Sequence, residues 1–147
     1  KPVSDELSSI PVFKDEIFAI MHKEHVLSDL EYLDAGHFGS VHLIINSFPI
    51  EGVAVYDHFL KPNKIHPIKI TAIPFTEISL SMIKANMGIM CTPKWQLNSF
   101  KLSKELVFKC IGKNGLKRNH YLVVKKERRN KKYIRDFISS FEEDFLE

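Results

Sequence analysis

The sequence has few of the residues that mark specialised protein classes. Only two cysteines, Cys91 and Cys110, occur among 147 residues, whereas a small secreted scaffold carries a dense cysteine pattern. No apolar run reaches the 18 residues typical of a membrane-spanning helix, and Lys1 to Ile10 lacks the apolar core of a signal peptide. These absences predict a cytoplasmic globular protein. Two reduced, buried thiols are the main interpretation of the cysteines, and a single disulfide between them stays open. Because the chain starts at Lys1 and not at Met, we expect a trimmed or processed N-terminus.

Motifs for catalysis are also missing. There is no Gly-x-Ser-x-Gly, no glycine loop for phosphate and no nuclease pattern, and neither cysteine has a neighbouring histidine. Asp57 and His58 are adjacent on a predicted strand, so their side chains point to opposite faces and cannot form a dyad. We therefore predict a non-enzymatic chain with no cofactor.

The strongest candidate for a metal site is the pair His22 and His25 on a predicted helix. Both side chains can reach one ion, with Glu24 nearby and His37 or Asp34 as a third ligand. The zinc-protease signature, however, needs histidines four residues apart and a glutamate in register. We therefore predict no metal site and read the pair as two surface histidines.

Apolar spacing predicts a single α+β domain over 1–147. Phe13, Ile17, Ile20 and Met21 recur at three and four residues, the period of a helix. Short apolar runs between turns then predict six to eight antiparallel strands, which form a bent sheet or partly open barrel. Asn114-Gly115 predicts a hairpin over 106–125, and the aromatic stripe of the last segment predicts a capping helix that faces the sheet. The predicted segments are an irregular lead-in over 1–12, helical residues over 13–30, antiparallel strands over 31–125 and the C-terminal helix over 133–146. The predicted strands include 41–45, 53–60, 68–73, 78–84, 89–92, 95–100 and 106–111.

Three of these segments resemble parts of a pleckstrin-homology-like domain of the bacterial or GRAM type. Ile73 to Ser79 is similar to an I-P-aromatic-x-x-I segment, Leu106 to Val124 to a late hairpin with a K-x-G turn, and Tyr133 to Phe145 to the capping helix. The resemblance covers about residues 40–145 and implies an interaction module that binds a protein or an anionic surface. The loop Asn46 to Gly52 has no lysine or arginine, so the phosphoinositide site of eukaryotic members is not implied.

Charge is strongly segregated along the chain. The net charge is −5 over residues 1–34, +2 over 35–100, +11 over 101–135 and −5 over 136–147. Such a basic stretch attracts phosphate on nucleic acid or at an anionic membrane surface. In the other interpretation, the acidic N-terminal segment and Glu142, Glu143 and Asp144 neutralise it. Lys61, Lys64, His66 and Lys69 form a second, smaller basic patch that we read as a solubility feature.

The sequence thus predicts a binding module, with two possible partners. The main interpretation is a pleckstrin-homology-like module for a protein or an anionic surface, and the alternative is a nucleic-acid-binding or regulatory protein that uses the basic hairpin and link over 113–132. The oligomeric state and the partner's identity stay open. The candidate binding residues share a basic side chain and are Lys113, Lys117, Arg118, Lys125, Lys126, Arg128, Arg129, Lys131 and Lys132.

Overall fold

The computed structural model describes residues 4–145, with side chains up to Phe141. It divides into two compact units: unit 1 contains Lys1–Asp15 and Lys117–Glu147, and unit 2 contains Glu16–Leu116. The prediction of a single domain over 1–147 stays a prediction. The first residues of the predicted lead-in, the end of the predicted last helix and the side chains of Glu142, Glu143 and Asp144 lie outside the described part.

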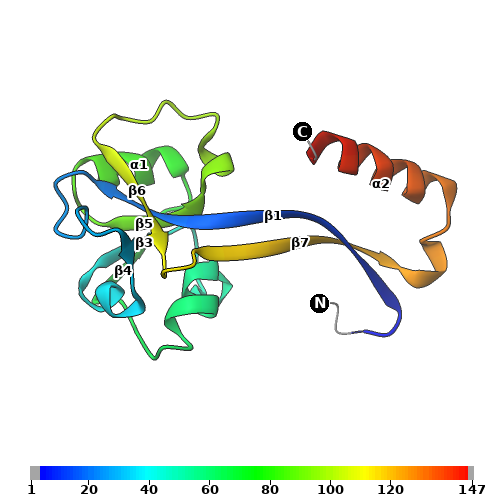
Figure 1. The fold of residues 1–147 in the computed structure, drawn as a ribbon, viewed down its shortest axis with the longest axis horizontal. Helices are drawn as coiled ribbons and strands as arrows, with labels where there is room; N and C mark the ends of the chain where they lie inside the picture. The colour runs from blue at the N-terminus through cyan, green and yellow to red at the C-terminus, as the bar shows by residue number, and fades with distance from the viewer. Residues whose placement is uncertain (1–3, 146–147) are drawn as a thin grey trace. The chain divides into compact units, whose positions relative to one another are not determined.

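Strands and helices alternate along much of the chain (Figure 1). The strands are β1 (Leu7–His22), β2 (Tyr32–Leu33), β3 (His42–Ile45), β4 (Lys69–Ala72), β5 (Ile89–Pro93), β6 (Leu106–Ile111) and β7 (Leu116–Lys125). The two α-helices are α1 (Thr76–Lys84) and α2 (Lys132–Phe145). Shorter helices are the 3-10 segments η1 (Ala35–Ser40), η2 (Ile50–Gly52), η4 (Lys94–Leu97) and η5 (Lys126–Arg128), and the π-helix η3 (Tyr56–Leu60). None of the helices in the described part is long and apolar enough to cross a membrane.

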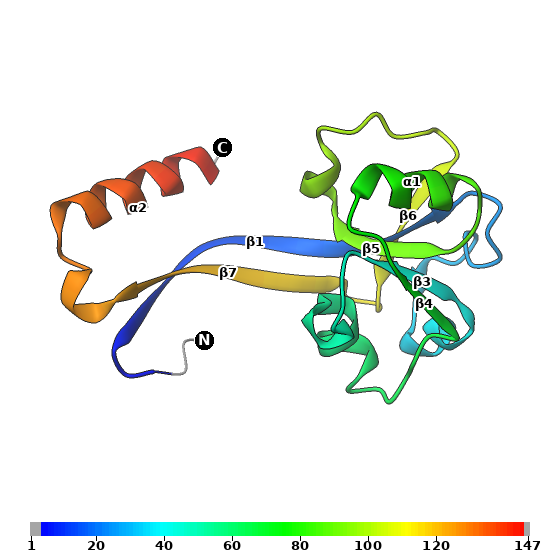
Figure 2. The same cartoon turned by 180° about the vertical axis from the view of Figure 1, so that it is seen from behind.

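The sheet is mixed, with the order β2-β6-β1-β5-β3-β4 and with β7 also paired to β1 (Figures 1 and 2). β1 runs antiparallel to β5 and β6, whereas β3 is parallel to both β4 and β5, and β2 is parallel to β6. The predicted fold class, an N-terminal helix followed by an antiparallel sheet and a capping helix, is therefore wrong. Parallel neighbours need crossover connections, and η3 and α1 supply them.

The core of unit 2 lies on both faces of this sheet. Ile17, Ala19 and Met21 of β1 belong to one buried cluster, whereas Ile20 belongs to a second cluster that includes Ile83 of α1. Alternate residues of a strand point to opposite faces, so β1 is covered from both sides. All buried apolar side chains of the described residues fall between positions 17 and 111, within unit 2.

This double burial explains why the predicted helix over 13–30 is wrong. The irregular lead-in predicted over 1–12 is wrong from Leu7 onward, where β1 begins. A strand buried on both faces reads as a continuous apolar run, and periodicity alone does not separate that run from a helix. Residues 17–21 form such a run at the centre of the sheet. The strand instead begins at Leu7 and continues to His22.

Several other predicted strands are helices, and the predicted hairpin does not form. Residues 54–60 fold as an α-turn that continues into η3, 76–84 as α1 and 94–97 as η4. The Asn114-Gly115 turn is present, with Gly115 at a φ of 74° that favours glycine. β6 and β7, however, are each hydrogen-bonded to β1, the long strand that offers both of them an edge. The strands predicted over 41–45, 68–73, 89–92 and 106–111 are confirmed as β3, β4, β5 and β6.

Unit 1 consists of the first half of β1, most of β7, η5 and α2. The C-terminal helix is confirmed, although its aromatic face is not buried as predicted: Tyr133 and Phe137 are each more than half exposed. The Phe137 ring instead lies against Phe141, with 6.0 Å between the ring centroids.

Candidate functional site

Three parallel strands of unit 2 create an edge of the kind that binds ligands in α/β proteins. The chain passes from β3 to β4 on one side of β3, and then through α1 to β5 on the other side. The connection after β3 therefore leads to one side of the sheet, whereas the connection after β5 leads to the other side, towards β6. Ligands bind outside the carboxyl ends of strands at such a topological switch point. The carboxyl ends of β3 and β5 mark the candidate site.

The strand register defines which residues meet at this edge. Ile45 of β3 pairs with Ala72 of β4, and Ile44 pairs with Met90 of β5. If the registers are continued past the strand ends, Asn46 is level with Ile73 beside one strand and with Thr92 beside the other. The Ile73 amide donates to the Ile45 carbonyl at 2.8 Å, which extends the β3–β4 pairing to this point.

The segment after β3 exposes a polar and an aromatic surface. Asn46, Ser47 and Phe48 are exposed, and Phe48 retains 61% of its accessible surface. Pro49 caps the short helix η2, whose first residue, Ile50, is buried in the core and anchors the loop. Phe75, after β4, is 64% exposed. The loops that follow β3 and β4 therefore expose an amide, a hydroxyl and two aromatic side chains.

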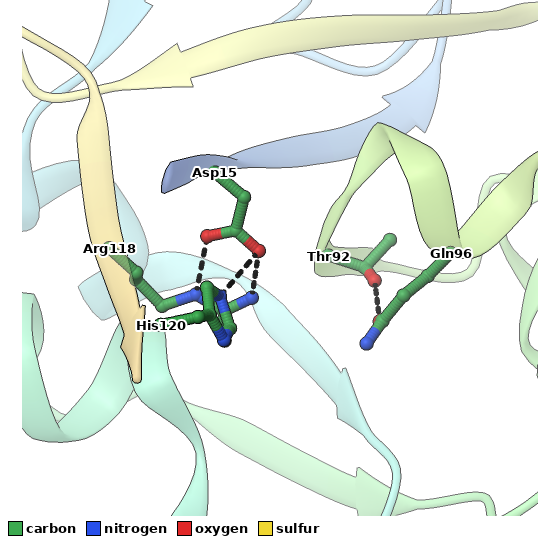
Figure 3. A network of polar contacts seen from close by, with 5 residues as sticks. All are labelled: Asp15, Thr92, Gln96, Arg118 and His120. Atoms are coloured by element: carbon green, nitrogen blue, oxygen red, sulfur yellow. Dashed lines mark hydrogen bonds and ion pairs between the residues drawn. The ribbon is translucent and has the colours of Figure 1, made fainter. Parts of the chain in front are cut away.

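Thr92 is the polar group at the end of β5. Its side chain is buried, and its Oγ1 donates to Oε1 of Gln96 on η4 at 2.5 Å (Figure 3). The contact ties the end of β5 to the following turn of helix. A neighbouring cation, Lys94, has its Nζ 4.4 Å from the centroid of the Phe18 ring, on the sheet face of β1 that carries Ile20.

Charged side chains are absent from the loops that follow β3 and β4 over 46–49 and 73–75. Neutral hydrogen-bonding groups recognise a small ligand by its hydroxyl, amide or carboxyl oxygens, and aromatic rings cover its apolar part. This part of unit 2 therefore suits a small organic molecule, and it lacks the nucleophile, base and orienting group that catalysis requires.

Unit 1 contains a separate buried charge network on β1 and β7. Asp15 has only 4% of its side chain exposed, and Arg118 binds both carboxylate oxygens, Nε to Oδ1 at 2.9 Å and Nη2 to Oδ2 at 2.5 Å (Figure 3). His120 Nε2 lies 3.1 Å from Oδ2. The His120 ring stacks on Phe13, with 4.2 Å between the centroids and 7° between the planes. The arrangement fixes Arg118 in place, so this candidate binding residue is already engaged.

The remaining predicted basic residues are exposed, but they occupy different places. Lys113 lies in the turn after β6 in unit 2, beside an open pocket of about 520 Å³ that also includes Asp34. Lys117 is exposed on β7 in unit 1. The other six lie within eight positions at the end of β7, in and after η5 and at the start of α2. Together they are named the basic cluster: Lys125, Lys126, Arg128, Arg129, Lys131 and Lys132.

The other sequence candidates form no metal or catalytic site in the described part of the chain. The prediction that Asp57 and His58 point apart on a strand is wrong, because both lie on η3, with Oδ2 and Nδ1 3.7 Å apart.

His22, predicted at the surface, is instead buried and accepts at Nδ1 from the Glu24 amide at 3.1 Å, and His25 accepts from the Leu27 amide at 3.2 Å. Burial lowers the pKa of His25. No group of three metal-ligating side chains occurs among the described residues, so the two histidines have no third ligand there.

Both cysteines are free in the structure. Cys91 on β5 and Cys110 on β6 lie on opposite sides of the intervening strand β1. Burial raises the pKa of the Cys91 thiol well above its ordinary value. A buried protonated thiol is a weak nucleophile, which agrees with a structural role for this residue.

Sequence reasoning missed the carboxyl edge of β3 and β5. The sequence predicts a turn over 46–52 between two strands, because the segments 53–60 and 78–84 have the apolar pattern of strands. Two helices that follow two apolar strands would have predicted parallel pairing and a ligand site at this edge. The signal was present in the apolar runs of β3 and β5, but their crossover helices are short.

Known proteins that resemble the chain include transcription regulators. The chain is 26% identical over 137 residues to "HTH-type transcriptional regulator MetR" of Haemophilus influenzae, covering 91% of this chain and 43% of the relative. It thus spans about two-fifths of the relative's length. The regulators are not enzymes, in agreement with the prediction from missing catalytic motifs.

Solved structures and a family model agree on the fold. The regulatory domain of MetR from N. meningitidis superposes with a TM-score of 0.88 at 22% identity, over 97% of this chain and 68% of that one. The regulatory domain of CcmR from Synechocystis superposes with a TM-score of 0.78 at 14% identity, over 99% of this chain and 70% of that one. The resemblance to a pleckstrin-homology-like domain is therefore wrong. It depended on a run of antiparallel strands followed by one helix, whereas η3 and α1 interrupt that run. The family model "LysR substrate binding domain" matches residues 1–146, and the chain belongs to this family.

Proposed function

We propose that this chain is the effector-sensing part of a transcription regulator and binds a small organic molecule at the carboxyl edge of β3 and β5. The observation that carries the proposal is the switch point at β3, with Asn46, Ser47 and Thr92 at the ends of the two strands. The related CcmR regulatory domain is solved in complex with 2-PG, which supports a small ligand for this fold. The regulator would act on DNA in the cytoplasm.

The lining favours a neutral mode of recognition. The loop after β3 supplies amide and hydroxyl groups, and Phe48 and Phe75 are exposed after β3 and β4. Such groups bind an oxygen-rich ligand that has a short apolar part. Bound effector stabilises the folded state by mass action, about 2.7 kcal/mol at a concentration one hundred times Kd.

The test is a thermal-shift screen of the full chain against organic acids, amino acids and sugar phosphates. At least one compound is expected to raise the melting temperature in a saturable way. Ser47→Trp fills the edge after β3 and is expected to abolish that shift. Ser40→Trp places the same ring on an exposed serine that precedes β3, at the opposite edge of the sheet, and is expected to leave the shift intact.

The two variants also define the contrary result. The proposed edge is contradicted if a compound raises the melting temperature of Ser47→Trp as much as that of the wild type. It is also contradicted if Ser40→Trp abolishes the rise as completely as Ser47→Trp does. A screen in which no compound shifts the melting temperature contradicts effector binding by this chain.

A further inference from the structure

The basic cluster is a dense and exposed set of cations. All six side chains are exposed, and they fall within eight consecutive positions, 125–132. They occupy the last residue of β7, the helix η5, the link after it and the first residue of α2. Six of the thirteen basic residues over 101–135 thus lie in this one segment of unit 1.

Acidic neighbours neutralise only part of this charge. In the part of the chain with described side chains, Arg128 is the only member within 4.0 Å of a carboxylate, 3.8 Å from Glu127. Both partners are more than half exposed, so the pair contributes little binding energy. Glu6 lines a shallow pocket with Lys125 and Lys126, and Asp136 follows Lys132 by one turn of α2 without an ion pair to it. The cluster keeps a clear excess of positive charge.

The backbone that carries the cluster is held in a defined shape. The Lys126 amide donates to the Glu6 carbonyl at 2.9 Å, and the Lys131 amide donates to the Arg128 carbonyl at 3.0 Å. Arg129 Nη1 donates to Ser8 Oγ on β1 at 3.1 Å, a neutral partner that orients the guanidinium without discharging it. Cations on a preformed backbone lose less conformational entropy when a ligand binds.

The chemistry of the cluster matches phosphate and not bases. Lysine and arginine donate to phosphate oxygens, and the release of counterions from DNA supplies the free energy. Residues 125–132 contain no aromatic side chain, and the exposed ring of Tyr133 that follows them is a single ring, whereas single strands stack successive bases on several rings. A duplex with its regular rows of phosphates is the ligand that this surface fits.

We propose that the basic cluster binds the phosphate backbone of duplex DNA without reading its sequence. The proposal rests on the proposed function, since a transcription regulator is held near DNA and even a weak second contact then gains from a high local concentration. The cluster is distinct from the effector edge, because it lies in unit 1 and the edge lies in unit 2.

The test measures binding of the full chain to a labelled DNA duplex of arbitrary sequence by fluorescence anisotropy. We expect a Kd in the range of about 10⁻⁴ to 10⁻⁶ M that weakens steeply between about 50 and about 200 mM salt. The double reversal Arg128→Glu with Lys131→Glu leaves the Arg129–Ser8 contact intact. This double variant is expected to raise Kd at least about tenfold. It is also expected to lower by about two the slope of the logarithm of the binding constant against the logarithm of the salt concentration.

A charge-matched control separates the cluster from net charge. Lys101→Glu with Lys104→Glu reverses two exposed lysines of unit 2 and is expected to change Kd less than about twofold. The conservative pair Arg128→Lys with Lys131→Arg is expected to keep the wild-type Kd. Binding that is unchanged by the cluster reversal, or equally weakened by the control, overturns the proposal.

A second arm distinguishes DNA from a membrane. Co-sedimentation with phosphatidylcholine vesicles that contain phosphatidylserine is expected to be weaker than DNA binding at the same salt. Tight vesicle binding without measurable DNA binding overturns the proposal in favour of a lipid surface. The effector screen uses neither DNA nor the cluster variants, so failure of one hypothesis is separate from failure of the other.

Discussion

Single side chains in unit 1 decide how β1 and β7 are held together. Asp15 is almost fully buried, and it neutralises Arg118 through two hydrogen bonds. Asp15→Asn removes the negative charge and leaves a partly buried guanidinium without its counter-charge. We expect the free energy of local opening of β7 to fall by about 2 to 4 kcal/mol, measured by hydrogen exchange of its amides.

An exposed ion pair in the same unit provides the control for this prediction. Glu127 is 71% exposed beside Arg128, and Glu127→Gln is expected to change the same free energy by less than about 1 kcal/mol. Equal effects of Asp15→Asn and Glu127→Gln would show that burial adds nothing to the Asp15 contact.

At one histidine, the pKa shift makes stability depend on pH. Burial lowers the pKa of His25 below its ordinary value of 6.5, and its Nδ1 accepts the Leu27 amide, which requires that nitrogen to be unprotonated. Above pH 6.5 the ring is neutral in both the folded and the unfolded chain, and the full stability is present. As the pH falls, the unfolded chain takes up the proton first, so the free energy of unfolding decreases until the folded pKa is passed.

His25→Gln isolates this contribution. Glutamine does not titrate, so the variant is expected to lose less stability than the wild type in urea titrations between about pH 7 and about pH 5. Parallel curves for the two proteins would falsify the assignment to His25.

At the scale of elements, the α1–β5 turn depends on one glycine. A Cβ atom at Gly88 would lie 2.5 Å from the backbone oxygen of His42 on β3, closer than real Cβ atoms approach. The turn is also tied to β3, since His42 Nδ1 lies 2.8 Å from the Met87 carbonyl oxygen. Gly88→Ala must displace one backbone and is expected to lower the free energy of unfolding by about 1 to 3 kcal/mol in urea titrations.

The matched substitution is Gly52→Ala, at the end of η2. Nothing lies within 4 Å of a Cβ built at Gly52, so its effect is expected to stay within about 0.5 kcal/mol. If both alanine variants are equally stable, β3 and the turn are less tightly packed than the contact at Gly88 implies.

The elements also show which parts of this fold the sequence can predict. β3, β4 and β5 are short apolar runs between turns, and the stripe of α2 has a clear helical period, so all four were recognised. β1 was read as a helix because both of its faces are buried, which removes the alternation that identifies a strand. α1 was read as a strand because Ser79 and Ser81 alternate with apolar residues. Its helix is stabilised by tertiary contacts such as that of Ile83 with the core.

The candidate site was predictable only in part, for the same physical reason. The basic residues of 125–132 can be identified from the sequence, because they are close along the chain whichever strands pair with one another. The candidate site at the carboxyl ends of β3 and β5 exists only if these strands are parallel neighbours. Their direction is set by the helical connections η3 and α1, and these are not evident from the residues of the strands themselves. Once residues 54–60 and 76–84 are helices, the two strands become parallel neighbours, and their carboxyl ends become the candidate site.

At the scale of the whole molecule, buried apolar surface is unevenly distributed between the two units. Every buried apolar side chain of the described residues belongs to unit 2, where two clusters cover both faces of the sheet. Unit 1 has the Asp15 network, backbone pairing of β1 with β7, and an α2 whose Tyr133 and Phe137 are exposed. Because burial of apolar surface is the main favourable contribution to folding, unit 2 contains the elements needed for independent stability.

We therefore expect the fragment 16–116 to fold by itself. Its near-ultraviolet circular dichroism, which reports fixed aromatic side chains, should resemble that of the full chain, and it should unfold in one cooperative urea transition. In the full chain, the slowest-exchanging amides should lie in β1 from Glu16 onward, β3 and β5, whereas those of α2 should exchange fastest. A fragment that keeps its secondary structure but loses the near-ultraviolet signal would show that unit 1 is needed for specific packing, and that the two clusters alone do not specify the folded sheet.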